Sequence, residues 1–365
     1  MPILTVNAGS SSVKLRLLGD DDSIVAEQEL SAPQAEVDPD ELRAALAGPL
    51  SGADAVAHRI VHGGERYREA TLIDPDVRRA LGELTELAPL HQPKSLAALD
   101  AVSAWLPGVP AVACFDTAFH ATLPPAASTY ALPARWRERW GLRRFGFHGL
   151  SHGWVARHAP DLLPARDVPW RIVSCHLGAG ASLCAIDGGR SIDTTMGFTP
   201  LEGLVMATRS GSVDPGLLLW LLEREAVSER EMAAALEHES GLAGLTGDAD
   251  MRTVLDRARR DDAQAAAAVD VYVHRLRAAV AAMTAALAGI DVLVFTGGVG
   301  EHASMIRRCA ADGLTFLGIG IDADANDHAS ADADITAAGA SVRTLVLRAR
   351  EDLEMSRQAR QVLSR

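Results

Sequence analysis

The fold of this protein is decided at residues 3–18, which read ILTVNAGSSSVKLRLL. Residues 3–6 are a short run rich in apolar and β-branched side chains, and residues 13–18 alternate between apolar and basic side chains before a final leucine. Such alternation is typical of a strand with one buried face, and the polar residues 7–12 between the two runs favour a tight turn. This stretch therefore predicts a strand, a turn and a second strand.

A second copy of this plan lies at residues 172–186, which read IVSCHLGAGASLCAI. Residues 172–176 and 182–186 are predicted strands, and the glycine-containing residues 177–181 form the turn between them. Residues 187–190, Asp-Gly-Gly-Arg, indicate a hairpin after the second strand. Two similar units this far apart predict a duplicated architecture, with one unit in each domain.

A third glycine-rich turn follows a predicted helix and strand. Apolar side chains recur at spacings of four and three between residues 269 and 287, so they form one helical stripe, and Gly289 is the expected stop just past the helix end. Residues 291–295 are a predicted buried strand, and residues 296–301, TGGVGE, form the turn before another helix. Strands that alternate with helices predict the α/β class.

Composition and charge exclude several classes of function. The 365 residues suffice for two domains of ordinary size, and a net charge of −13 repels phosphate backbones, so nucleic acid is not an expected partner. Residues 1–12 lack the basic start and the long apolar stretch typical of a signal peptide, and no apolar run approaches the ~20 residues needed to span a bilayer. None of the four cysteines forms a CxxC pair, which favours reduced core cysteines. We therefore expect a cytoplasmic protein without a membrane partner.

Glycine turns that follow strands suggest a phosphate-binding function. They let backbone N–H groups approach a phosphate closely, and a helix that starts at the turn favours anions. The chain has no GxxxxGKS/T segment, which excludes a P-loop protein, and residues 297–300 fall short of the dinucleotide-binding pattern GxGxxG. Three such turns in one chain favour a nucleotide site over three unrelated structural turns.

Five further segments place polar or charged residues among apolar ones. They are residues 57–65 (AHRIVHGGE), 88–93 (APLHQP), 114–120 (CFDTAFH), 144–152 (RFGFHGLSH) and 193–215 (DTTMGFTPLEGLVMATRSGSVDP). With these segments the sequence resembles the acetate kinase family, within the superfamily of acetate and sugar kinases, heat-shock ATPases and actin. The resemblance covers nearly the whole chain, and the motifs follow one another in the order of the family.

The resemblance implies two actin-like, ribonuclease H-like α/β domains with an active-site cleft between them. Residues 1–117 and 353–365 would form the first domain, and residues 118–352 the second, which carries most of the nucleotide site. The implied reaction is the reversible, in-line transfer of a phosphoryl group from ATP to acetate, which gives acetyl phosphate. Because the family is homodimeric, a homodimer is expected too.

The resemblance also implies catalytic roles for Arg59, Asp116, His148 and Arg209. The two arginines and the histidine would hold the substrate carboxylate and the transferring phosphoryl group, and an arginine fork suits these planar anions better than a lysine. The substrate's short alkyl tail would lie against apolar side chains. The implied substrate-binding residues are Arg59, Val61, Leu90, Phe147 and Pro200.

Nucleotide and metal sites are implied in the same way. The nucleotide-binding residues would be Ser10, Ser12, Lys14, His176, Gly178, Gly180, Asp250, Arg252, Gly298, Val299 and Gly300. Mg²⁺, or Mn²⁺ in its place, would bind at Asn7 and Glu351, with Asp116 beside them, directly or through water.

Simpler roles remain open for several of these residues. Asp116 could cap a helix, Glu351 could merely start a surface helix, and the apolar pocket residues could be ordinary core. Further histidines match the family, and for His120 and His152 a structural role competes with a catalytic one.

The sequence departs from the family pattern at four motif positions: Gln92, Leu150, Ala179 and His302 stand where the family has Asn, Thr, Asn and Asn. The segment around Glu351 also lacks the usual TNE. Three alternatives to acetate kinase stay open. These are a propionate or butyrate kinase, an actin-like or chaperone-like ATPase, and a catalytically weak paralogue.

Overall fold

In the computed structural model, the chain divides into two compact units. The structure describes residues 1–9, 12–32, 38–89, 91–224, 227–330 and 332–365. One unit comprises residues 1–121, 147–154 and 350–365, and the other comprises residues 122–146 and 155–349. The domain boundaries expected from the sequence, and the cleft between the domains, stay predictions.

The first unit is built on a six-stranded sheet in the order β3-β2-β1-β4-β6-β5. Its strands are β1 (Ile3–Ala8), β2 (Ser12–Leu18), β3 (Ile24–Ser31), β4 (Ala55–Ile60), β5 (Thr71–Leu72) and β6 (Ala111–Phe115). Its helices are α1 (Pro39–Ala47), α2 (Pro75–Glu83), η2 (Leu84–Leu87), α3 (Gln92–Trp105) and α15 (Glu351–Leu363). The two strands predicted within residues 3–18 are confirmed as β1 and β2, which pair antiparallel, and residues 10 and 11 of the predicted turn lie outside the described residues.

The second unit repeats this plan in the order β11-β12-β10-β7-β8-β9. Its strands are β7 (Arg171–Leu177), β8 (Ala181–Asp187), β9 (Arg190–Thr194), β10 (Val292–Thr296), β11 (Ala333–Asp334) and β12 (Arg343–Val346). Both sheets have three antiparallel strands at one side, parallel strands in the centre and a short antiparallel strand at the other edge. The duplicated α/β architecture predicted from the two glycine turns is therefore confirmed.

The second unit also contains a set of helices. They are α4 (Pro125–Ser128), α5 (Ala134–Trp140), η4 (Ala159–Leu162), α7 (Pro215–Glu223), α8 (Glu229–His238), α9 (Gly241–Thr246), α10 (Met251–Ala258), α11 (Ala263–Ala286), α12 (Gly297–His302), α13 (Ser304–Asp312), η5 (Thr315–Leu317) and α14 (Ala323–Asp327). Two further helices, η3 (Ala118–Thr122) and α6 (Gly149–His158), run in sequence from one unit into the other. None of the helices formed by the described residues combines the length and the apolar character that crossing a bilayer requires.

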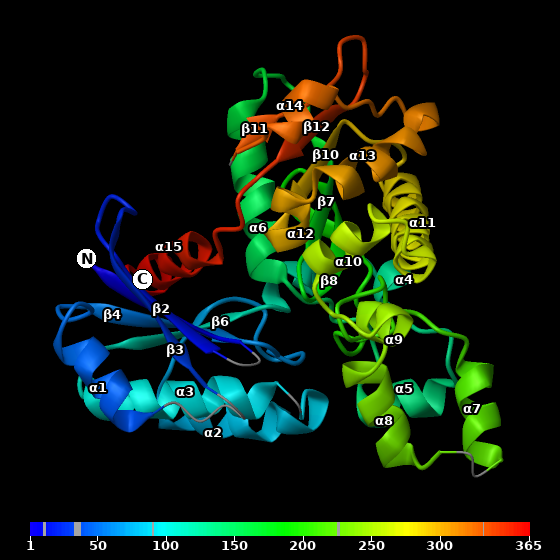
Figure 1. The fold of residues 1–365 in the computed structure, drawn as a ribbon. Coiled ribbons are helices and arrows are strands. Elements are labelled where there is room, and N and C mark those ends of the chain that lie inside the picture. Colours follow the sequence, from blue (N-terminus) through cyan, green and yellow to red (C-terminus); the bar gives the residue numbers. More distant parts are fainter. Residues whose placement is uncertain (10–11, 33–37, 90, 225–226, 331) are drawn as a thin grey trace. The chain divides into compact units, whose positions relative to one another are not determined.

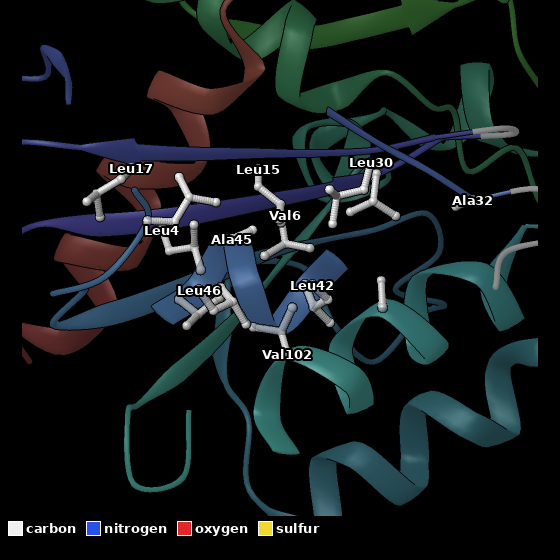
Figure 2. Close-up of a cluster of buried hydrophobic side chains, with 14 residues drawn as sticks. Leu4, Val6, Leu15, Leu17, Leu30, Ala32, Leu42, Ala45, Leu46 and Val102 are labelled. Atoms are coloured by element: carbon white, nitrogen blue, oxygen red, sulfur yellow. The ribbon is translucent and has the colours of Figure 1, made fainter. Parts of the chain in front are cut away.

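The alternation of side chains along the first sheet gives each of its faces a separate core. Leu4 and Val6 of β1 point to one face, where they pack with residues of α1 and α3 (Figure 2). Ile3 points to the opposite face and packs with Met355 and Ala359 of α15. In Figure 1, α15, in red, lies on the side of this sheet opposite to α1 and α3. The face covered by α15 is the one that carries the candidate site.

The end of α11 corrects one detail of the sequence analysis. Gly289 was the expected residue in the left-handed position after the helix, but Ala288 has φ 53° and Leu287 caps the helix. Gly289 follows with φ 136°, and its N–H donates to the carbonyl of Thr284. The local pattern could not show this, because alanine carries a steric cost in that conformation that the surrounding packing must offset.

Candidate active site

Three polar side chains come together at the carboxyl ends of β1, β4 and β6. These strands are parallel, and Arg59 of β4 lies opposite Cys114 of β6. Because side chains alternate along a strand, Asn7, Arg59 and Asp116 all point to the face that α15 covers. Polar residues at this edge of a sheet are well placed to bind a ligand.

Hydrogen bonds join these side chains into one network. Arg59 Nη2 and Nε donate to Asp116 Oδ2 at 2.6 and 3.0 Å, and Arg59 Nη1 donates to Asn7 Oδ1 at 3.0 Å. Asn7 Nδ2 donates in turn to Glu351 Oε2 at 3.0 Å. Glu351 is the first residue of α15, so the expected helix start and the expected place beside Asn7 are both found.

The network is largely withdrawn from solvent. The side chain of Asp116 is 1% exposed and that of Arg59 is 17% exposed. Burial lowers the pKa of Arg59, but the charges of Asp116 and Glu351 and the hydrogen bonds to Asp116 raise it by more, so the guanidinium stays charged. The carboxylate of Asp116 is bonded to Arg59, which favours a role in the site, and the helix cap considered from the sequence stays an alternative.

The oxygens of this network fit a magnesium ion. Asn7, Asp116 and Glu351 offer one amide and two carboxylate groups, and Mg²⁺ prefers oxygen ligands and is usually held by one or two carboxylates with water and phosphate. The described part of the chain contains no group of three or more His, Cys, Asp or Glu side chains that could enclose a metal. The donor set therefore fits a cation that is held partly by these side chains and partly by oxygens of a substrate phosphate.

His148 lies next to Asp116 in a backbone conformation that is rare for residues with side chains. Its φ is 55°, and its carbonyl accepts a hydrogen bond from His152 N at 2.9 Å. The following Gly149 donates its N–H to the carbonyl of Asp116 at 2.8 Å, and a Cβ at Gly149 would collide with that carbonyl. The glycine of this motif thus permits the close approach that holds His148 beside the network.

His120 and His62 contact Phe147, and His152 packs against His120. His120 Nε2 lies 2.9 Å from the carbonyl oxygen of Phe147, and its ring meets the ring of His152 edge-on with centroids 5.8 Å apart. His62 meets the Phe147 ring edge-on at 5.5 Å. Both His120 and His152 are buried. These contacts favour the structural role for His120 and His152 that the sequence left open.

Gln92, one of the departures from the family pattern, anchors the segment after β4. Its Oε1 accepts from His62 N at 3.2 Å, and its Nε2 donates to the carbonyl of His62 at 3.2 Å and to that of Leu81 at 3.3 Å. The side chain is fully buried. The longer amide therefore bridges two backbone segments of the first unit.

The apolar pocket candidates have different positions. Val61 directly follows β4 and is 9% exposed, and Phe147 is 1% exposed; both belong to the first unit. Pro200 belongs to the second unit and is buried. Leu90 lies outside the described residues. Burial of these side chains is compatible both with a pocket and with core packing, so their role stays a prediction.

Arg209 belongs to the second unit, in an irregular segment between β9 and α7. Its Nη1 donates to the carbonyl of Pro200 at 2.7 Å, and its own carbonyl accepts from Met206 N at 3.1 Å. Gly211 has φ 70°, and a Cβ there would collide with the carbonyl of Leu204. The segment 199–211 is therefore fixed by its own backbone contacts, which orient Arg209.

The second unit contains a cavity of about 610 Å³, within the usual range for small-molecule sites. It lies beside the glycine turns that follow β7 and β10, where Gly297 has φ 78° and a Cβ would come within 2.8 Å of the carbonyl of Leu177. Five of the residues expected to bind nucleotide line it: Gly178, Asp250, Arg252, Gly298 and Val299. Residues far apart in sequence thus form one cavity, and its role as a nucleotide site stays a prediction.

The remaining expected nucleotide residues lie elsewhere. His176 and Gly180 flank the cavity residue Gly178 in sequence, and Gly300 is buried in α12. Lys14 and Ser12 belong to β2 of the first unit, where Lys14 pairs with Asn7. Ser10 lies outside the described residues. Roles in nucleotide binding stay predictions for all of these positions.

Sequence reasoning missed much of the cavity wall. The residues not anticipated are Ala207, Leu242, Ala249, Met251, Leu255, Asp256, Arg259, Tyr272, Ala303 and Ser304. Most of them lie on helices, where an apolar stripe predicts core contacts and an empty space beside it leaves no mark in the sequence. Ala179 and His302, noted only as departures from the family, also line the cavity.

Comparisons with known proteins agree with this arrangement. A model of the acetokinase family matches residues 40–357. The acetate kinase of Gloeobacter violaceus is 46% identical over 317 residues, which cover 86% of this chain and 78% of the relative. The crystal structure of the acetate kinase of Porphyromonas gingivalis has a TM-score of 0.89 at 33% identity, with 99% of both chains covered. That of a propionate kinase from Francisella tularensis also has a TM-score of 0.89, at 31% identity and 98% coverage of both chains.

Proposed function

The chain belongs to the acetate kinase family of phosphotransferases, and from this premise we propose that it transfers the γ-phosphoryl group of ATP to acetate, reversibly, and forms acetyl phosphate. The observation that carries the proposal is the network of Asn7, Arg59, Asp116 and Glu351. It offers a guanidinium fork for a carboxylate and oxygen ligands for a cation within one unit.

The first unit is proposed to hold the acceptor. The Arg59 fork presents parallel N–H donors that match the two oxygens of a carboxylate, and its buried position strengthens that interaction. Val61 and Phe147 would contact the short alkyl tail. Acetate would then present one carboxylate oxygen to the incoming phosphorus atom while the other stays bound to Arg59.

The charge of the transferring phosphoryl group is proposed to be stabilised by His148 and Arg209. In such transfers the transition state is loose, so positioning and neutralisation of charge supply most of the rate enhancement. His148 would donate a hydrogen bond to an equatorial oxygen, and Arg209 would act as an arginine fork on the same group. Each is held by backbone contacts, so little reorganisation is needed during the reaction.

The nucleotide is proposed to bind in the cavity of the second unit, with its phosphates at the glycine turn of Gly178 and at the start of α12. There Gly298 and Val299 line the wall of the cavity, at the glycine turn that follows β10. A magnesium ion would neutralise the phosphates, and Asn7, Asp116 and Glu351 are the residues that would hold it.

The proposal is tested by trapping acyl phosphate as a hydroxamate, with ATP and magnesium, in the presence of acetate, propionate or butyrate. We expect product with acetate and a lower kcat/KM with propionate. Higher kcat/KM with propionate or butyrate would make the enzyme a kinase of that acid. ATP turnover at the same rate without any acid would favour the ATPase alternative, and absence of turnover would favour the weak paralogue.

A homodimer is part of the proposal, and α7 is the surface that we propose for it. This helix reads PGLLLWLLE and has no buried residue within the chain, although Leu217, Leu219 and Trp220 are large and apolar. A helix that is apolar on all sides requires cover, and a two-fold axis would place the same patch of a second copy against it. Light scattering should give twice the chain mass, which Trp220→Glu should halve and Phe316→Glu, at an isolated exposed position, should not. The expected cytoplasmic location stays a prediction.

A further inference from the structure

The Arg59 fork lies on the same oxygens that are proposed to hold the cation. Both Nε and Nη2 of Arg59 bond to the Asp116 carboxylate, while Nη1 bonds to the amide oxygen of Asn7. Glu351 is close enough to raise the pKa of Arg59 by its charge, and it also accepts from Asn7. Every oxygen donor of the cation site is therefore tied, directly or through Asn7, to one guanidinium.

A guanidinium and a divalent cation that use the same oxygens oppose each other's binding. Asp116 is buried, and a buried carboxylate requires a cationic partner, because unpaired burial of a charge is costly. A divalent cation at Asp116 and Asn7 would stand within a few ångströms of Arg59, where like charges repel strongly in a site withdrawn from water. Binding of one partner therefore weakens the binding of the other.

We infer that Arg59 and the divalent cation compete for Asp116 and Asn7, and that this competition couples cation binding to capture of the substrate carboxylate. When Arg59 leaves Asp116, its Nε and Nη2 donors become available to a carboxylate of matching shape. A carboxylate bound to Arg59 in turn leaves the Asp116 oxygens to the cation. The two ligands therefore strengthen each other's binding, and the coupling is reciprocal. This inference rests on the proposed acceptor role of Arg59.

The direct test measures Mn²⁺ binding to the full chain without nucleotide, by the electron paramagnetic resonance signal of free Mn²⁺. Arg59→Met removes the competing charge, and we expect it to tighten Mn²⁺ binding by about tenfold or more. Arg16→Met is the matched control. It removes the same charge from the same unit, at a side chain that pairs with Glu27 and with Asp352, the neighbour of Glu351. We expect this control to change the Kd by no more than about twofold.

A second titration, with sodium acetate present, tests the coupling itself. In the wild-type chain acetate should tighten Mn²⁺ binding, with sodium chloride at equal ionic strength as the reference, and in Arg59→Met it should have no effect. Arg59→Lys keeps the charge but loses the fork, so it should show a smaller acetate effect, and it provides the test if Arg59→Met does not fold.

The inference is overturned if Arg59→Met binds Mn²⁺ no more tightly than the wild type, if Arg16→Met tightens binding as much, or if acetate leaves the wild-type titration unchanged. None of these readouts requires turnover. A chain that shows the coupling but forms no acetyl phosphate would refute the proposed function alone, and a chain that forms acetyl phosphate without the coupling would refute the inference alone.

Discussion

His58 predicts how the stability of the first unit responds to acid. It lies on β4 and is 1% exposed, and neither ring nitrogen has a hydrogen-bond partner among the residues that the structure describes. Burial lowers its pKa from 6.5 to about 3, although the charge of Asp100 opposes this shift. The unfolded chain therefore takes up a proton at a pH where the folded chain does not, and stability falls as pH falls below about 6.5.

The magnitude follows from this pKa difference. Each pH unit between the two pKa values costs about 1.4 kcal/mol, so lowering the pH from about 6.5 to about 5 costs about 2 kcal/mol at this residue. His58→Leu removes the titrating ring and keeps a similar volume. At neutral pH the variant should be at least as stable as the wild type, because a buried ring without partners is replaced by an apolar side chain. At about pH 5 it should be more stable by about a further 2 kcal/mol.

Urea unfolding followed by circular dichroism at the two pH values measures the gap in free energy of unfolding between His58→Leu and the wild type. Val56→Ile is the control, because it changes packing on the same strand and the same face without changing a titratable group. The gap between His58→Leu and the wild type should widen at the lower pH, whereas that of the control should stay constant. His62 retains its own acid sensitivity in every variant, since burial lowers its pKa to about 4. If the gap of His58→Leu did not widen, the buried imidazole would have to be protonated in the fold, and the reasoning would be wrong.

Three further predictions concern the reaction and its support. Arg209→Ala should lower kcat by roughly 10³-fold, by analogy with arginine fingers, and Arg209→Lys should recover little of it, whereas near wild-type turnover would remove Arg209 from the mechanism. Val61→Ala should lower the KM for propionate relative to acetate and leave each kcat within about tenfold, and a change in stability alone would make Val61 a core residue. Gln92→Leu should lower the free energy of unfolding by about 1–3 kcal/mol, because the backbone N–H of His62 loses its acceptor, and an unchanged urea midpoint would contradict this.

The repeated sheet could be predicted because its signals are local. Alternating side chains and glycine turns mark β1–β2 and β7–β8, and the helical stripe marks α11. The end of α11 could not be predicted in detail, since Ala288 takes a conformation that only its surroundings enforce. Local pattern thus predicts the elements well and their strained ends poorly.

The candidate site was predicted less completely than the fold, because contacts between distant residues decide most of it. Arg59 within β4 and Asp116 directly after β6 are conspicuous in the sequence, because charged side chains rarely occur among buried residues. Which partner each of them has is decided by the register of the sheet, so the pairing of Arg59 with Asp116 became visible only in three dimensions. The wall of the cavity was harder still to predict, because apolar helix residues such as Tyr272 and Leu255 follow the same sequence pattern whether they line a cavity or pack in a core.

The position of α15 has a consequence for how the chain is made. Met355 of α15 packs on the face of the first sheet to which Cys114 points, and its carbonyl accepts a hydrogen bond from Cys114 Sγ. The two residues are 241 positions apart in the sequence. On the ribosome the strands of the first unit emerge early. The apolar face that α15 will cover, which includes Ile3, Ala57 and Cys114, stays exposed to solvent while the second unit is synthesised. Such an interval, at translation rates of about 5–20 residues per second, lasts for tens of seconds and favours aggregation or capture by chaperones. The unit that begins the protein is therefore the last to be completed, and Glu351 reaches Asn7 only then.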